Sequence, residues 1–478
     1  MKVEPVVYQI YPRSFRDSDG DGVGDLRGIR SRLDHLVELG ADALWLSPIY
    51  PSPLADFGYD VTDYTAIDPV YGTFDDFEAL VDAAHERDLA VLLDVVPCHT
   101  SIEHPWFREH PDWYIWADEP NNWLCAFGGS AWTFHEGQGR YYLHSFYPEQ
   151  PDLDWRDPEV VEAMHGVLRF WLERGVDGFR IDAIDRLLKD PELRDDPPAR
   201  AGFGLPLRED EARLALTNSR DHPDIGPALA GIREAVGDAF LVGEVYLPSA
   251  RWRPYLEHLD AVFAFELLHA PFDAGALRAA IEASLAARGR SGGGVAWVMS
   301  NHDFGRLATR FGEANARAAA LLLLTLPGAA FVYQGDEIGQ PEGPGADPPY
   351  DRAGRDRYRH PMQWDASPSG GFTTGQPWLP LVDPAERNVE AEARDRGSVL
   401  TLYRELIALR RDLGGDVRLV DAVPGILAYE RGEHLVAINT TDGELPVPAA
   451  GEARLETAPG ALASSSLAPH AGVVLARG

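Results

Sequence analysis

The sequence predicts an α/β fold: a (β/α)8 barrel of the TIM type, with a small inserted domain after the third strand and a C-terminal β-sandwich domain. Short apolar runs alternate with longer helical patterns up to about residue 410, and polar motifs directly follow several of the runs. Continuous apolar strands between helices are typical of a parallel sheet buried on both faces. About eight such units can be counted, enough to close the sheet into a barrel with its functional residues at the strand ends.

The strands of the barrel are expected where short, mostly apolar runs occur. In chain order these runs are 6–11, 43–46, 90–96, 178–182, 240–243, 261–265, 294–299 and 329–333. Helical patterns at 74–87, 160–174 and 228–236 precede three of them, as a strand–helix alternation requires. A doubly wound open sheet is the alternative, but that fold more often brings a glycine-rich phosphate turn, and the sequence has none.

Two segments interrupt the alternation. Residues 100–152 are rich in Trp, Tyr, His and Pro without a helical period, which predicts a small domain inserted between two parts of the barrel, 1–99 and 153–414. Within residues 415–478, short alternating runs such as 434–439 are separated by Pro and Gly, which predicts a terminal β domain.

Composition and charge argue against some classes of binding partner. The net charge of −33 at pH 7 disfavours nucleic acids and anionic membranes, because both repel an acidic surface. No apolar run approaches the length that spans a bilayer. Lysine is nearly absent, which either the base composition of the genome or adaptation to salt would explain. We therefore expect no nucleic-acid or membrane partner, and the oligomeric state stays open.

The cysteines and the N-terminus bear on the compartment. Cys98 and Cys125 are the only two cysteines, too few for a disulfide framework in a chain of 478 residues, although one bridge between them stays open. Residues 1–5 lack the basic and then apolar blocks of a secretory signal. Both observations favour a cytoplasmic protein.

Three acidic residues each follow an apolar run in separate windows: Asp182, Glu244 and Asp303. Breaking an acetal bond needs a carboxylate and a carboxylic acid facing each other across one atom, so these three acids predict an active site. Arg180 lies two residues before Asp182, on the same strand face, where its charge would keep a nucleophilic carboxylate ionised. A structural ion pair is the alternative for Asp182 alone. Glu244, close to other carboxylates, suits a general acid.

An acidic loop near the N-terminus has the spacing of a site for a hard cation. Asp17, Asp19, Asp21 and Asp25 alternate with residues that permit a tight loop, and the Val23 carbonyl would add a backbone ligand. The final bidentate glutamate of an EF-hand is absent, which argues against a calcium sensor. We predict a structural Ca²⁺ here, with Mg²⁺ as an alternative occupant and a solvated acidic turn as the alternative without metal.

Aromatic residues and a further Asp–His window accompany the three acids. Aromatic faces stack on sugar rings, but most aromatic residues of the expected insert, taken singly, are better explained as its core. Asp94 lies within the third apolar run, and His99 follows it. A stretch rich in Pro and Gly at 340–349 predicts a long loop after a strand, and such loops are usually functional or disordered.

Together these windows resemble glycoside hydrolase family 13, the α-amylase family, and within it the bacterial α-glucosidases and oligo-1,6-glucosidases. The resemblance extends from residue 7 to about residue 411, and its motifs agree in order and spacing. The matching motifs lie at 94–99, 150–155, 178–182, 243–245, 301–303 and 361–365.

The resemblance implies a retaining mechanism on small α-glucosides, through a covalent glucosyl-enzyme intermediate. Asp182 would attack the anomeric carbon, Glu244 would protonate the leaving oxygen and then activate water, and Asp303 would hold the 2- and 3-hydroxyls. The pocket for the terminal glucose would be formed by Asp56, Tyr59, His99, Phe146, Arg180, His302 and Arg359. The acidic loop matches the metal loop of the subfamily.

Cys98 and Asp154 depart from the family pattern, because Cys98 stands where the motif usually has Asn and Asp154 stands where many relatives have Asn. Ala183 follows the expected nucleophile and bears on linkage preference. Relatives that prefer α-1,6 bonds resemble one another in having Val after the nucleophile, whereas α-1,4 enzymes often have smaller or polar residues. We therefore predict an exo-acting α-glucosidase that prefers α-1,4-linked glucosides such as maltose.

Two other functions stay open. A transglucosidase or sugar isomerase would use the same three acids and transfer glucose to a sugar or alcohol instead of water. A non-catalytic barrel that binds sugars or assists a transporter should have lost one or more of the acids and carry a membrane anchor. This chain keeps all three acids, which disfavours the second alternative.

Overall fold

A closed barrel of eight parallel strands forms the centre of the computed structural model, which describes residues 4–199, 210–288 and 294–477. The strands are β1 (Val6–Ile10), β2 (Ala43–Leu46), β3 (Ala90–Val95), β7 (Gly178–Ile181), β8 (Phe240–Gly243), β9 (Ala261–Phe263), β10 (Gly294–Val298) and β11 (Ala329–Tyr333). Each strand pairs with the next in this order, and β11 pairs with β1 to close the ring. The predicted fold class is confirmed.

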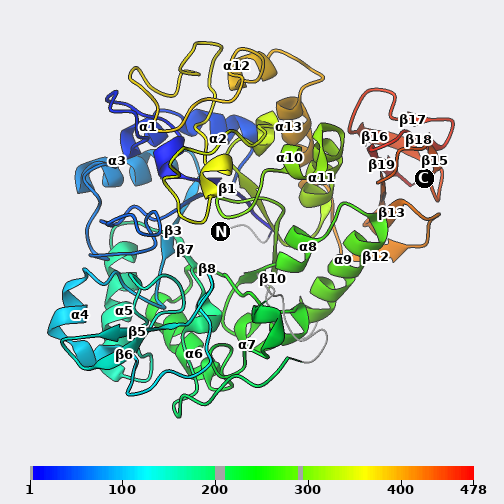
Figure 1. Cartoon of the computed structure of the whole chain (residues 1–478). Helices are drawn as coiled ribbons and strands as arrows, with labels where there is room; N and C mark the ends of the chain where they lie inside the picture. The colour runs from blue at the N-terminus through cyan, green and yellow to red at the C-terminus, as the bar shows by residue number, and fades with distance from the viewer. Residues whose placement is uncertain (1–3, 200–209, 289–293, 478) are drawn as a thin grey trace.

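Helices cover the outside of the barrel (Figure 1). The longer helices are α3 (Phe74–His85), α5 (Pro158–Leu172), α6 (Ile225–Val236), α9 (Ala274–Arg288), α11 (Glu313–Thr325) and α13 (Val399–Arg410). The shorter helices are α1 (Leu26–Arg30), α2 (Leu33–Leu39), α4 (Pro105–Glu109), α7 (Arg253–Leu256), α8 (Phe265–His269), α10 (Leu307–Phe311) and α12 (Val389–Glu392). Helix α3 begins at a capping box, in which the Thr73 hydroxyl and the Asp76 carboxylate each accept from the other residue's backbone N–H.

The strand predicted at 261–265 is wrong at its end, because its last residue begins a helix. Strand β9 ends at Phe263, and helix α8 begins at Phe265. A short apolar run fits a buried strand or a buried helix equally well, so periodicity alone could not separate them.

The hydrophobic core has two layers, because strand side chains alternate between the inside and outside of a barrel. Trp45, Leu92, Phe263 and Phe331 belong to the cluster that fills the interior. A larger cluster includes outward-facing residues such as Leu44 and packs the strands against the surrounding helices. This filled interior leaves the strand ends as the place for a pocket.

Two additions flank the barrel on opposite sides in Figure 1. Between β3 and β7, an antiparallel sheet is formed by β4 (Trp116–Ala117), β5 (Trp132–His135) and β6 (Arg140–Leu143). At the C-terminal end, one sheet contains β12 (Val417–Val420), β13 (Ile426–Arg431), β14 (His434–Asn439), β16 (Glu452–Glu456) and β19 (Gly472–Ala476), and a second contains β15 (Leu445–Pro446), β17 (Leu462–Ala463) and β18 (Ser466–Leu467).

Two further sequence expectations concern disulfides and membranes. Cys98 and Cys125 are both buried free thiols, so the bridge that the sequence left open is not formed. Within the described ranges, no helix combines the length and the apolar character that crossing a bilayer requires.

Candidate active site

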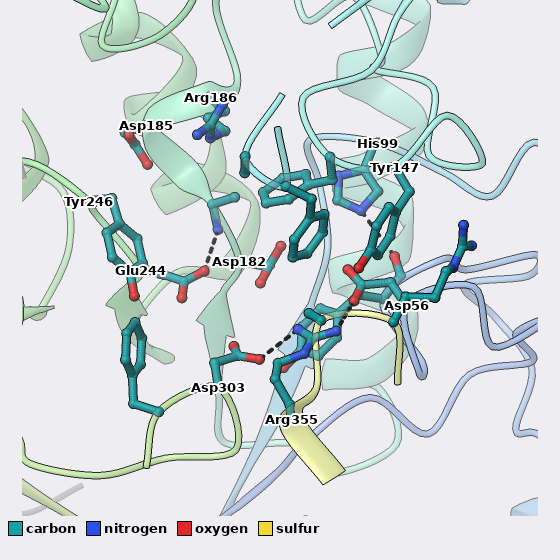
Figure 2. A pocket seen from close by; sticks show the side chains of 18 of the residues that line it. Asp56, His99, Tyr147, Asp182, Asp185, Arg186, Glu244, Tyr246, Asp303 and Arg355 are labelled. Atoms are coloured by element: carbon teal, nitrogen blue, oxygen red, sulfur yellow. Dashed lines mark hydrogen bonds and ion pairs between the residues drawn. The ribbon is translucent and has the colours of Figure 1, made fainter. Parts of the chain in front are cut away.

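A pocket of about 480 Å³ lies at the carboxyl ends of the barrel strands (Figure 2). Asp182 directly follows β7, Glu244 directly follows β8, and Asp303 lies in the loop after β10. The barrel therefore brings the three acids of distant sequence windows to one rim. The predicted residues that line the pocket are Asp56, Tyr59, His99, Phe146, Asp182, Ala183, Glu244 and Asp303.

Arg180 holds three carboxyl groups together below the pocket. Its Nη1 lies 2.8 Å from Oδ1 of Asp94 and 2.6 Å from Oδ1 of Asp182. Its Nη2 lies 2.8 Å from Oε1 of Glu244. The register explains this grouping, because Arg180 on β7 is paired with Asp94 on β3, and β8 is the other neighbour of β7. All four side chains are buried, so their charges interact strongly.

One guanidinium does not neutralise three buried acids. Burial raises the pKa of Asp182 well above its usual range, and the Glu244 and Asp94 carboxylates raise it further against the opposing effect of Arg180. Burial likewise raises the pKa of Asp94 to about 7, again opposed by Arg180. Sequence reasoning considered only the Arg180–Asp182 pair and expected an ionised Asp182. The full cluster opposes that ionisation, because the Glu244 and Asp94 carboxylates raise the pKa of Asp182.

Ala183 directs the Glu244 carboxylate into the pocket. Its backbone has a φ of 42°, in the left-handed region that few residues other than glycine adopt. In this conformation the Ala183 N–H donates a hydrogen bond of 3.0 Å to Oε2 of Glu244. The turn after β7 therefore fixes the position of the acid that follows β8.

Asp303 is surrounded by hydrogen-bond donors. Arg355 and Arg359 donate to its Oδ1 at 2.8 and 3.1 Å, and Nε2 of His302 lies 3.2 Å from its Oδ2. Burial alone would raise the pKa of Asp303, but His302 and the two arginines hold that pKa well below its usual range. Burial lowers the pKa of His302 to about 3. Asp303 is therefore a carboxylate beside a neutral imidazole.

Three of the predicted glucose-contacting residues do not line the pocket. Arg180, His302 and Arg359 are buried behind its wall. Arg180 contacts Asp182 and Glu244, Arg359 contacts Asp303, and His302 contacts Asp303 and the Tyr59 hydroxyl, the latter at 2.7 Å. The structure therefore places these three residues where they position lining groups.

Asp56 lies at the end of the pocket away from Glu244 (Figure 2). Gln150 Nε2 lies 3.0 Å from Oδ2 of Asp56 and 3.0 Å from Nε2 of His99. Arg355 forms ion pairs with both Asp56 and Asp303. Burial lowers the pKa of His99 to about 4, so this imidazole is neutral. The far end of the pocket is thus a connected polar network.

Sequence reasoning did not assign eleven of the residues that line the pocket, and five of these are Arg352, Arg355, Tyr147, Tyr246 and Phe304. Arg355 lies shortly before the 361–365 motif, and Tyr246 lies two residues after Glu244. Their closeness to recognised motifs could have indicated that these two residues belong to the site. The other three residues lie on irregular segments, where neither period nor spacing indicates which way a side chain points.

Cys98 makes only weak contacts in place of the amide hydrogen bonds that Asn would offer. Its Sγ lies 3.7 Å from the Arg186 carbonyl oxygen and 3.9 Å from Oδ2 of Asp152. Lys189 Nζ pairs with that Asp152 oxygen at 2.5 Å. Burial raises the pKa of the Cys98 thiol well above its usual range, so it stays neutral.

The acidic loop brings three of its four aspartates together. Carboxylate oxygens of Asp17, Asp19 and Asp21 lie within 4.8 Å of one another. Asp25 instead caps helix α1, where its Oδ1 accepts from the Gly28 N–H at 2.7 Å. Burial would raise the pKa of Asp17, but the Thr373 hydroxyl and backbone N–H groups lower it overall. The remaining cluster offers the hard oxygen donors that Ca²⁺ prefers.

The chain is similar to known proteins in sequence and in fold. The chain matches the family model "Alpha amylase, catalytic domain" over residues 9–414. It is 38% identical to a probable alpha-glucosidase of Rhizobium meliloti (strain 1021), over 89% of this chain and 86% of that protein. It is 36% identical to an oligo-1,6-glucosidase of Parageobacillus thermoglucosidasius, over 93% and 91% of the two chains. The solved structure of an alpha-glucosyl transfer enzyme has a TM-score of 0.91 and 38% identity, with 99% of each chain covered.

Proposed function

Because the chain belongs to the α-amylase family of glycoside hydrolases, we propose that it is a retaining, exo-acting α-glucosidase that releases glucose from short α-glucosides. The observation that carries this proposal is the placement of Asp182 and Glu244 on the two terminal nitrogens of one guanidinium. Retaining glycosidases hold their two carboxyl groups only about 5–5.5 Å apart, and a shared arginine favours such a close pair.

Each acid would have a separate task in this mechanism. Asp182 attacks the anomeric carbon and forms the glucosyl-enzyme, while Glu244 donates a proton to the leaving oxygen. Glu244 then removes a proton from the water that hydrolyses the intermediate. Asp303, fixed by Arg355 and Arg359, accepts hydrogen bonds from sugar hydroxyls as positive charge develops on the ring.

The stereochemistry of the product tests this proposal. ¹H NMR of maltose hydrolysis should show α-glucose from the cleaved unit before mutarotation, because two displacements at one carbon retain its configuration. β-Glucose formed first from the cleaved unit, or the absence of any glucose, would contradict the proposed function.

We propose a preference for α-1,4 over α-1,6 linkages, on the basis of the small Ala183 side chain next to Asp182. The expected result is a kcat/KM for maltose about tenfold above that for isomaltose, within the range that pocket shape achieves between similar substrates. Substituting Ala183 by Val should narrow this ratio. Side-by-side kinetics on the two disaccharides measure it, and equal or better rates on isomaltose with the unsubstituted enzyme would refute the preference.

Transglucosylation is the second candidate function, favoured by the likeness to the alpha-glucosyl transfer enzyme. A sugar or alcohol that reaches the glucosyl-enzyme before water would receive the glucose. Product analysis at high maltose concentration, with and without an added acceptor alcohol, separates transfer from hydrolysis.

We propose that the acidic loop binds a structural Ca²⁺ through Asp17, Asp19 and Asp21, with the Val23 carbonyl as a further ligand. We expect Ca²⁺ to raise the Tm of chelator-treated protein and an Asp19→Asn, Asp21→Asn double variant to lose most of that increase, because a bound ion stabilises the folded state by mass action. Thermal scans with Ca²⁺, Mg²⁺ or EGTA measure it, with exposed Asp63→Asn as the control. An identical Tm in all three conditions would rule out a structural metal.

A further inference from the structure

Two arginines of one loop enclose two aromatic side chains of the insert at the outer end of the pocket. The Arg352 guanidinium lies 4.4 Å from the centre of the Tyr147 ring, and Tyr147 stacks on Phe127 at 4.0 Å with an interplanar angle of 13°. The Arg355 guanidinium lies 5.5 Å from the Phe127 ring. Arg352 also pairs with Glu149 of the insert at 3.1 Å. Arginine, tyrosine, phenylalanine and arginine thus form one continuous stack.

This stack lies at the end of the pocket that is farther from the general acid. The Tyr147 N–H donates to Oε1 of Gln150 at 3.0 Å, and Gln150 Nε2 donates to Asp56 at the same distance. Arg355 pairs with Asp56 as well. Figure 2 shows Asp56, Tyr147 and Arg355 together on the side opposite Glu244. A leaving group departs on the Glu244 side, so the stack faces the non-reducing end of a bound glucose.

We propose that Arg352 and Tyr147 are specificity-determining residues that close the pocket at the non-reducing end and exclude a second sugar from that position. The inference rests on the proposed function and deepens it, because it assigns the exo-acting character to named side chains. A glucan chain that continued past the terminal glucose would have to pass through the space that the Tyr147 ring fills. That ring is covered on its faces by Phe127 and Arg352, and Arg352 is in turn held by Glu149.

The contacts of Arg352 explain why neither residue acts alone. Its partners Tyr147 and Glu149 belong to the insert, whereas Arg352 belongs to the long loop after β11. A planar guanidinium covers an aromatic face in a way that a lysine ammonium does not. Loss of Arg352 uncovers Tyr147, and loss of Tyr147 leaves the space itself open.

The product released first from 4-nitrophenyl α-maltoside tests the proposal. The wild-type enzyme should release glucose and leave 4-nitrophenyl α-glucoside. The Arg352→Ala, Tyr147→Ala double variant should release maltose and 4-nitrophenol directly, with a maltose-to-glucose ratio at least about tenfold higher. Arg352→Ala alone should show a smaller rise, and Arg352→Lys should lie between Arg352→Ala and wild type.

Arg357→Ala is the matched control, because Arg357 is an exposed arginine of the same loop that does not line the pocket. It should give the wild-type product ratio. A folded double variant that still hydrolyses 4-nitrophenyl α-glucoside but releases only glucose from the maltoside would overturn the inference. If the double variant does not fold, an unchanged ratio in Arg352→Ala and Arg352→Lys would overturn it as well. A wild-type enzyme inactive on 4-nitrophenyl α-glucoside would instead refute the proposed function itself.

Discussion

Replacing Asp182 by Asn should lower kcat by roughly four orders of magnitude or more, the size of effect seen when a covalent nucleophile is removed. An amide cannot form the glucosyl ester, and neither Glu244 nor Asp303 can replace it, because each is held by its own hydrogen bonds in a different position. Steady-state kinetics on 4-nitrophenyl α-glucoside measure the loss.

The fold should survive this substitution. Asn has the shape of Asp, and Arg180 keeps its ion pairs with Asp94 and Glu244. Because burial raises the pKa of Asp182, removal of its charge should leave the Tm unchanged or higher at pH 7. Asp154→Asn, a carboxylate outside the pocket, is the control and should keep full activity. Turnover by Asp182→Asn within tenfold of wild type would disprove the nucleophile assignment.

Replacing Arg180 by Met should destabilise the protein by about 3–5 kcal/mol at neutral pH, the cost of removing one partner of a buried ion pair. Asp94, Asp182 and Glu244 would then share a buried site without a cation. Activity should also be lost. The exposed Arg169→Met variant, which removes only an ion pair with Glu162, is the control and should change stability by less than about 1 kcal/mol.

The loss of stability in the Arg180→Met variant should increase as the pH rises. Burial raises the pKa of Asp94 to about 7 even with Arg180 present, and raises that of Asp182 well above its usual range. An acid whose pKa is higher in the folded than in the unfolded protein stabilises the fold at acidic pH. That stabilisation is lost as the pH rises from the unfolded pKa of about 4 through the folded pKa. Without Arg180 the loss should be larger, so the Tm difference from wild type should grow between pH 5 and pH 8. A constant difference would contradict this electrostatic origin.

Most of the barrel could be predicted from the sequence because its strands are short apolar runs with clear boundaries. The run at 43–46 and the run at 329–333 correspond to β2 and β11 without adjustment. The exception at β9 arose where an apolar strand passes directly into an apolar helix. Local pattern is sufficient where strand and helix periods differ, and insufficient where both elements are fully buried.

The site residues, like the strands, were predictable only where local sequence pattern was sufficient. Asp182, Glu244 and Asp303 were visible because each directly follows a strand or lies shortly after one. The sharing of Arg180 by three acids and the bond from Ala183 to Glu244 were not, because they depend on contacts between neighbouring strands. The predicted barrel places consecutive strands side by side, but sequence spacing does not give the register that pairs Arg180 with Asp94.

Asp25 illustrates a competing local role. Its spacing placed it with Asp17, Asp19 and Asp21 as a cation ligand, but its carboxylate caps helix α1 and accepts from Ser18. Aspartate is among the preferred N-cap residues, since its side chain satisfies backbone N–H groups at the first turn. The acidic spacing and the helix start coincide here, and in the structure the helix cap occupies the side chain.

Trapping the glucosyl-enzyme tests the central claim of this account most directly. A slow fluorinated substrate, 5-fluoro-α-glucosyl fluoride, should form a covalent adduct whose intact mass exceeds that of the protein by one fluoroglucosyl unit. Peptide mapping by tandem mass spectrometry should place that adduct on Asp182, and the adduct should disappear as activity returns. An adduct on another residue, or turnover of this substrate without any adduct on Asp182 in rapid-quench samples, would contradict a double-displacement mechanism built on Asp182.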